Sequence, residues 1–258
     1  MTHQDFNLHE ACANQSNEPL SLPFFHSCSG HELRDIFRSK EITPSLCKKF
    51  NENLLYMFYG LPAYDPNKEE YASAYYGVFP VIFIIKNNAV QNPKRLFPFD
   101  SGAFKDGLFS EILRNDISQY QIGNAVSDIA KYIKLFFGDE RRYINGEIKV
   151  NQSEFSAFYF EVKCLCEMIS TKLHMRKSDI RYRVVEAQLE NSIKFSGEQI
   201  KAIIVPSMYL SENILVEYLF ENDVDIIDYD ILEYPPSHMI PHLIKESLEY
   251  IESECFCE

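Results

Sequence analysis

Two histidines and a cysteine lie close together near the start of the chain, in LPFFHSCSGHELRD, at His26, Cys28 and His31. A thiolate nucleophile needs a base within hydrogen-bonding distance, and residues two apart on a β-strand point to the same face. The spacing of His26 and Cys28 therefore permits cysteine-based hydrolysis. No Asn or Asp that would orient the histidine can be identified, and the alternative role of Cys28 is that of a small buried side chain.

Motifs for metals and for nucleotide phosphates are absent from the sequence. His238 and His242 stand four residues apart, but Pro241 lies between them, and there is neither HExxH nor a paired CxxC. The nine glycines form neither GxxxxGK(S/T) nor GxGxxG. We therefore expect no metal site and no P-loop, kinase or Rossmann-type nucleotide site.

A second set of candidate residues is spread along the chain in the order His, Tyr, Glu. An apolar run ends at His26, a helix with Leu33 and Ile36 follows it, and a tyrosine-rich segment comes next. The tyrosines of that segment are Tyr56, Tyr59 and Tyr64. The acid lies beside a later apolar strand and is either Glu198, in FSGEQIKAIIVP, or Glu186, in YRVVEAQLE.

In this order and spacing the set resembles the three motifs of ADP-ribosyltransferase-fold proteins. The resemblance implies that His26 hydrogen-bonds a ribose of NAD, that a tyrosine stacks on nicotinamide, and that the acid binds the nicotinamide ribose. It implies an enzyme that uses NAD as co-substrate, cleaves the nicotinamide glycosidic bond and transfers ADP-ribose to a protein or nucleic acid. A carboxylate near that ribose would stabilise the oxocarbenium-like transition state more than the ground state. The chain departs from the family pattern at Cys28, where many members carry Thr.

A function without catalysis is the alternative. The acidic chain would then be an interaction protein, such as an immunity or defence component, that binds a protein partner through two aromatic segments, residues 54–64 and 96–104. The second segment, LFPFDSGAF, contains Asp100, whose side chain we expect to cap the amides of Ser101 and Gly102; a place at the edge of a pocket is the alternative. Exposed aromatic side chains in these segments would favour this alternative.

A cluster of basic residues runs against the overall charge of the chain. Its members fall within twelve residues, at Lys172, His174, Arg176, Lys177, Arg181 and Arg183. Cations favour the carboxyl end of a helix, so a solvated helix end explains the cluster. The alternative is a docking site for nucleic acid or for a ligand that carries a phosphate.

The elements that must position these residues follow from hydrophobic periodicity. Strands are predicted from the residue after Pro80 to residue 85, and at 182–190, 199–205 and 225–232. Helices are predicted at 108–114, 124–138, 153–172, 210–220 and 241–251. This pattern predicts an α+β fold, a single domain over residues 21–258 with a mixed, largely antiparallel sheet flanked by helices. Its middle segment, about 108–172, is helical. Residues 1–20 are polar and predict a loosely ordered leader.

Composition limits the partners and the compartment. The chain has 258 residues, with 38 acidic against 25 basic side chains, and its formal charge of −13 opposes binding to phosphate backbones or anionic membranes. Seven cysteines, an odd number, and the lack of a secretory signal predict reduced thiols in a cytoplasmic protein. The longest apolar run, residues 78–85, is too short to cross a bilayer.

Overall fold

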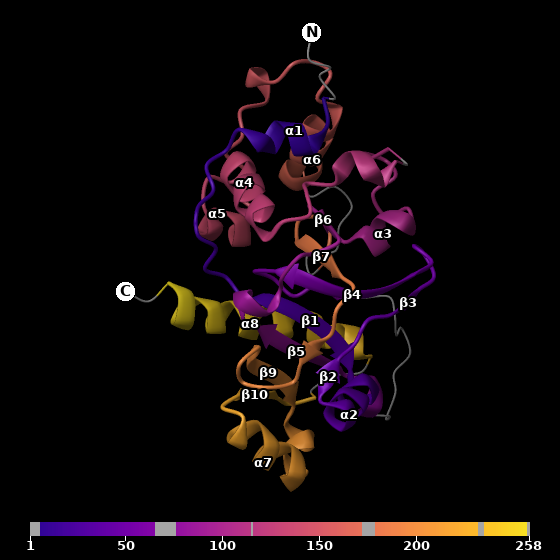
Figure 1. The fold of residues 1–258 in the computed structure, drawn as a ribbon, viewed down its shortest axis with the longest axis vertical. Helices are drawn as coiled ribbons and strands as arrows, with labels where there is room; N and C mark the ends of the chain where they lie inside the picture. The colour runs from indigo at the N-terminus through magenta and orange to yellow at the C-terminus, as the bar shows by residue number, and fades with distance from the viewer. Residues whose placement is uncertain (1–5, 65–75, 115, 172–178, 232–234, 257–258) are drawn as a thin grey trace. The chain divides into compact units, whose positions relative to one another are not determined.

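A computed structural model describes residues 6–64, 76–114, 116–171, 179–231 and 235–256 (Figure 1). The chain forms two compact units, each assembled from two stretches of sequence. We call residues 1–21 with 91–188 the helical unit, and residues 22–90 with 189–258 the sheet unit. The prediction of one domain over residues 21–258 stays a prediction.

The sheet unit is built on five strands in the order β10–β9–β5–β1–β4, with β3 paired to β4. Their bounds are β1 (Phe24–Ser29), β3 (Ser45–Cys47), β4 (Glu52–Tyr59), β5 (Pro80–Ile85), β9 (Ile200–Pro206) and β10 (Asp225–Tyr229). β9 and β10 run parallel, whereas the other pairs in this order are antiparallel. A separate two-stranded ribbon joins β2 (Glu41–Ile42) to β8 (Ile193–Lys194). The predicted α+β class with a mixed, largely antiparallel sheet is confirmed.

Strand β5 is the centre of this unit because it lies between β1 and β9. All six of its residues are buried, as expected for a strand that is covered on both faces. Pro80 stands at its first position, where a missing amide costs the sheet least.

Helices cover both faces of the sheet in this unit: α2 (Gly30–Ser39) and α7 (Asn213–Glu221) on one face, and α8 (Ile240–Cys255) on the other (Figure 1). On the first face, aromatic contacts run from β5 through the loop before β9 to α7 and α2, at Phe83, Phe195, Tyr218 and Phe37. On the second face, the Tyr250 hydroxyl of α8 donates to the Asp225 carboxylate of β10 (3.0 Å).

The helical unit contains α1 (Leu8–Ala13), α3 (Ser101–Lys105), α4 (Val126–Phe136), α5 (Glu140–Asn145), α6 (Phe160–Thr171) and the antiparallel pair β6 (Arg95–Phe97) and β7 (Val185–Leu189). Where the sequence predicts a loose leader, Leu8 and Cys12 of α1 are buried, and α1 packs on α4 and α6. Short 3-10 turns complete the two units: η1 (Tyr76–Val78), η2 (Asn87–Ala89), η3 (Ile117–Tyr120), η4 (Gln152–Glu154), η5 (Ser207–Ser211) and η6 (Pro236–Met239).

One predicted helix does not form, and others start later than predicted. Residues 108–114 form turns instead of a helix. The helix predicted from residue 153 begins at Phe160. Gln152–Glu154 form a 3-10 turn instead, in which the Asn151 side chain accepts the Ser153 amide (3.2 Å). The predicted cap Asn124 is replaced by Ala125, whose amide donates to the Asp128 carboxylate (3.1 Å). In the part of the chain that the structure describes, no helix has both the length and the apolar character needed to cross a bilayer.

Candidate functional site

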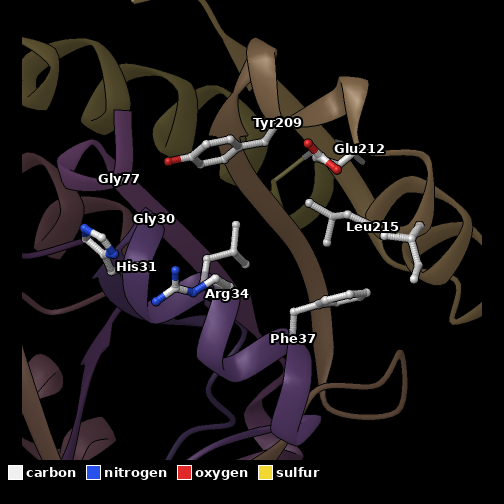
Figure 2. Close-up of a pocket in the computed structure, with 10 residues that line it drawn as sticks. Gly30, His31, Arg34, Phe37, Gly77, Tyr209, Glu212 and Leu215 are labelled. Carbon is white, nitrogen blue, oxygen red and sulfur yellow. The ribbon is translucent and has the colours of Figure 1, made fainter. Parts of the chain in front are cut away.

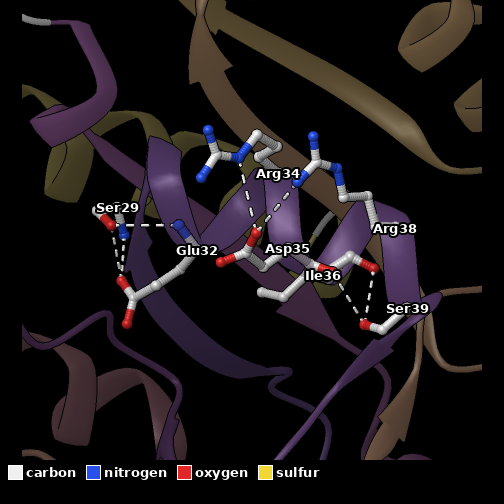
Figure 3. Close-up of polar contacts among 7 residues, drawn as sticks. All are labelled: Ser29, Glu32, Arg34, Asp35, Ile36, Arg38 and Ser39. Carbon is white, nitrogen blue, oxygen red and sulfur yellow. Dashed lines mark hydrogen bonds and ion pairs between the residues drawn. The ribbon is translucent and has the colours of Figure 1, made fainter.

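Helix α2 contributes polar side chains to two cavities of the sheet unit. It begins with a capping box: the Ser29 hydroxyl accepts the Glu32 amide (3.3 Å), and the Glu32 carboxylate accepts the Ser29 amide (2.7 Å; Figure 3). At its other end Lys40 adopts a left-handed conformation, with φ of 61°.

The two polar faces of α2 differ in charge. Leu33 and Ile36 are its buried residues and form the stripe that packs into the core. With helical spacing, Glu32 and Asp35 lie on one side of this stripe and His31 and Arg34 on the other. One helix therefore presents an acidic wall to one cavity and a basic wall to the other.

The first cavity, which we call the acidic cleft, has a volume of about 500 Å³ and lies between α2, β2 and β4. Its polar lining includes His26, Tyr56 and three acids, Glu32, Asp35 and Glu41. Ile36, Ile42, Leu54 and Phe58 add an apolar surface. The cleft thus combines one histidine, one tyrosine and several carboxylates on an apolar base.

His26 is held by the backbone of the neighbouring strand. Its Nδ1 lies 3.0 Å from the carbonyl oxygen of Tyr56. A carbonyl can only accept a hydrogen bond, so this contact requires a proton on Nδ1 and leaves Nε2 of the neutral ring as an acceptor. The Tyr56 hydroxyl donates to the Cys47 sulfur (2.9 Å).

The three acids of the cleft differ in the hydrogen bonds and ion pairs that their carboxylates already make. Glu32 is committed to the cap of α2. Asp35 lies between two exposed arginines, 3.6 Å from Arg34 and 3.9 Å from Arg38 (Figure 3). Within the described residues, the Glu41 carboxylate makes no hydrogen bond or ion pair, so it is the acid best able to bind a ligand.

The other tyrosines predicted for the site lie elsewhere. Tyr59 is fully buried, packs edge-on against Phe24, and its hydroxyl accepts the Leu22 amide (3.1 Å). Tyr64 is half-buried and does not line the acidic cleft. Cys28, the predicted alternative nucleophile, is buried, and His31 lines the second cavity. Of the predicted binding residues, the cleft therefore brings together His26 and Tyr56.

Neither of the two predicted acids lines the acidic cleft. Glu198 is an exposed residue of the loop before β9. Glu186 belongs to the helical unit, where it is 0% exposed and accepts hydrogen bonds from the Ser101 amide (2.9 Å) and from Gln188 (2.8 Å). Its carboxyl also lies 2.6 Å from the Ser101 hydroxyl. Burial, with a smaller effect of the nearby Asp100 charge, raises the pKa of Glu186 to about 8.

The two members of the predicted basic cluster that the structure describes form hydrogen bonds to other residues of the helical unit. Arg181 is buried and donates two hydrogen bonds to Asp179 (3.0 and 2.9 Å). Arg183 donates to the backbone carbonyls of Tyr143 and Ile144, both at 2.9 Å. Lys172, His174, Arg176 and Lys177 lie outside the described residues, so docking of nucleic acid or phosphate there stays a prediction.

The second cavity, which we call the α2–α7 cavity, has a volume of about 390 Å³. Figure 2 shows His31 and Arg34 on α2, with Tyr209 and Glu212 across from them. Leu33, Phe37, Ile214 and Leu215 supply its apolar lining. Sequence reasoning missed this cavity because its residues come from separate segments that share no motif.

Among the described residues, no group of three or more His, Cys, Asp or Glu side chains is placed to bind a metal ion. Comparison with protein-family models, with curated proteins and with solved structures found no match to this chain. Function must therefore be argued from the two cavities themselves.

Proposed function

We propose that the acidic cleft binds the nicotinamide–ribose end of NAD. The chain would then be an ADP-ribosyltransferase-like protein that cleaves the glycosidic bond between nicotinamide and ribose. The observation that carries the proposal is the cleft lining. His26 and Tyr56, two of the residues that the resemblance assigns to NAD, share one cavity with three carboxylates. Transfer of ADP-ribose to a macromolecular acceptor is part of the same proposal.

Charge favours this end of the NAD molecule. The nicotinamide ring of NAD is a cation, and the cleft lining contains Glu32, Asp35 and Glu41 but no Lys or Arg among the described residues. Carboxylates also accept hydrogen bonds from ribose hydroxyls, and they stabilise the positive charge that develops when the glycosidic bond breaks. The same lining disfavours the pyrophosphate, which must then remain outside the cleft.

Within this proposal Glu41 takes the part that the sequence assigns to Glu198 or Glu186. Glu198 does not line the cleft, and Glu186 lies in the helical unit. Tyr56 would pack against the nicotinamide ring, and Nε2 of His26 would accept a ribose hydroxyl.

Calorimetric titration with nicotinamide riboside, with NAD and with neutral nicotinamide tests the proposal. We expect nicotinamide riboside to bind at least as tightly as NAD, because it lacks the pyrophosphate, and nicotinamide to bind more weakly because it lacks the positive charge. Replacement Glu41→Gln should weaken riboside binding about tenfold, the effect of losing one charge-assisted hydrogen bond of about 1.5 kcal/mol. Glu198→Gln, an exposed acid outside the cleft, is the matched control.

Catalysis is measured as release of nicotinamide from NAD, with and without a cell extract as the source of acceptors. We expect release by the wild-type chain, and its loss in His26→Ala and in Glu41→Gln. Failure of the wild-type chain to bind riboside at millimolar concentration, or equal binding by Glu41→Gln, would refute the proposal for this cleft. Binding without release would leave a nicotinamide-riboside-binding protein and exclude the transferase activity.

The alternative, a partner-binding surface made by residues 54–64 and 96–104, has less support. Phe58, Tyr59, Phe97 and Phe99 of these segments are all buried. Asp100 accepts the Ala103 amide (2.8 Å) as the cap of α3, so it caps as expected but at Ala103 instead of at Ser101 and Gly102. The exposed aromatic surface that would favour this alternative is not present at these four residues.

A further inference from the structure

We infer that the α2–α7 cavity is a second binding site, for a small monocarboxylate that has an apolar body. It is a separate cavity from the acidic cleft, so the inference does not depend on the proposed NAD chemistry. A pocket of about 390 Å³ falls in the size range of sites for small organic molecules.

The basic wall of the cavity supplies the attraction for an anion. His31 and Arg34 are three residues apart on α2 and lie on the same side of the helix. Arg34 pairs with Asp35 at 3.6 Å, but both side chains are more than half exposed, 56% and 67%, so this pair is weak and can be exchanged for a ligand. At the start of α2 the Gly30 amide donates to the Phe79 carbonyl (3.1 Å) and the Glu32 amide donates to Ser29, so we assign the anion to side chains.

The opposite wall decides which anion fits. Tyr209 brings a hydroxyl that can donate a hydrogen bond, and Glu212 brings a negative charge (Figure 2). A carboxylate carries one charge and can be bound by Arg34 in a planar, bidentate pair. A phosphate monoester carries nearly two negative charges, and Glu212 repels the second one. The cavity therefore favours a monocarboxylate over a phosphate.

The remaining lining fits the apolar part of such a ligand. Leu33, Phe37 and Leu215 form an apolar surface beside the charged wall, and Ile214, which is 66% exposed, extends it to the rim. Covering an exposed isoleucine and an aromatic ring stabilises the complex through the area removed from water.

Two glycines bring the polar side chains close to the backbone. A β-carbon on Gly77 would lie 2.8 Å from Nε2 of His31, and one on Gly30 would lie 1.9 Å from the Tyr209 hydroxyl oxygen. Alanine at either position would displace a polar side chain of the cavity. Gly77→Ala is the milder change, because the ring edge of His31 can rotate away, and it should weaken anion binding.

The test titrates the full chain with 3-phenylpropionate, with its neutral amide 3-phenylpropanamide and with phenyl phosphate, by calorimetry and by NMR shifts of backbone amides. We expect 3-phenylpropionate to bind and to shift the amides of residues 30–37, 77 and 209–215. The neutral amide should bind at least about tenfold more weakly, because it loses the charge-assisted contact with Arg34. Phenyl phosphate should also bind at least about tenfold more weakly, because Glu212 repels its second charge.

Arg34→Gln should lower the affinity for 3-phenylpropionate at least about tenfold. Arg38→Gln is the matched control: Arg38 also pairs with Asp35 and is more exposed than Arg34, but it does not line the cavity. Equal losses in the two variants, equal binding of the amide, tighter binding of phenyl phosphate, or no binding to the wild-type chain at millimolar concentration would each overturn the inference.

Discussion

At the scale of single residues, Glu186 is an acid that the fold has removed from water. Its carboxyl is hydrogen-bonded to Ser101 and Gln188, and the side chains of all three residues are 0% exposed. Burial dominates over these hydrogen bonds and raises the pKa to about 8, so the carboxyl is neutral in the folded chain at pH 7. A neutral acid that is buried and hydrogen-bonded to Ser101 and Gln188 contributes to the packing of the helical unit.

Glu186 should make the free energy of unfolding depend on pH. Its folded pKa is above that of the unfolded chain, so its contribution is complete below the ordinary carboxyl pKa of 4.5 and is lost as pH rises through about 8. The slope is at most about 1.4 kcal/mol per pH unit. We expect Glu186→Gln, which cannot ionise, to gain stability relative to the wild type between pH 5 and 8, as measured by urea unfolding.

The slope of the free energy of unfolding against pH, compared between the wild type and the variant, separates the ionisation of Glu186 from changes in packing. A glutamine amide alters the hydrogen bonds with Ser101, but that cost does not change with pH. Glu147→Gln, at an exposed position of the same unit, should leave the slope unchanged. Parallel pH profiles for the wild type and Glu186→Gln would contradict the raised pKa.

At the scale of elements, the cap of α2 affects both cavities because the helix supplies a wall to each. Ser29→Ala removes the acceptor of the Glu32 amide and releases the Glu32 carboxylate from the Ser29 hydroxyl (2.9 Å). We expect it to lower the free energy of unfolding by about 1 kcal/mol. Ser29→Thr keeps a hydroxyl and should lose much less in the same denaturation experiment. A Ser29→Ala variant as stable as the wild type would show that the box contributes little.

Helix α2 also shows what a sequence can and cannot predict. Its capping serine, its apolar stripe and its charged faces are local, so the helix was predictable and is confirmed. Tyr56 and Tyr59 are three residues apart on one strand, so alternation alone predicts that they point to opposite faces. The position of Glu41 depends on the pairing of β2 with β8, at Glu41 and Lys194, which no local pattern indicates. The cleft acids could therefore not be chosen from the sequence.

At the scale of the whole molecule, the formal charge of −13 acts differently on the two cavities. A cation that approaches the acidic cleft is attracted both by the local carboxylates and by the overall charge. A carboxylate that approaches the α2–α7 cavity is attracted by Arg34 but opposed by the overall charge. Salt screens both fields, over a distance of about 10 Å at 0.1 M.

Salt should consequently separate the two sites on one protein sample. Raising sodium chloride from about 20 to about 300 mM should weaken binding of nicotinamide riboside several-fold, because both attractions are screened. Binding of 3-phenylpropionate should change less, because screening weakens its pairing with Arg34 and its repulsion by the overall charge together. Parallel calorimetric titrations over this range measure both slopes. Riboside affinity that does not depend on salt would mean that the carboxylates of the acidic cleft are not what attracts the cation.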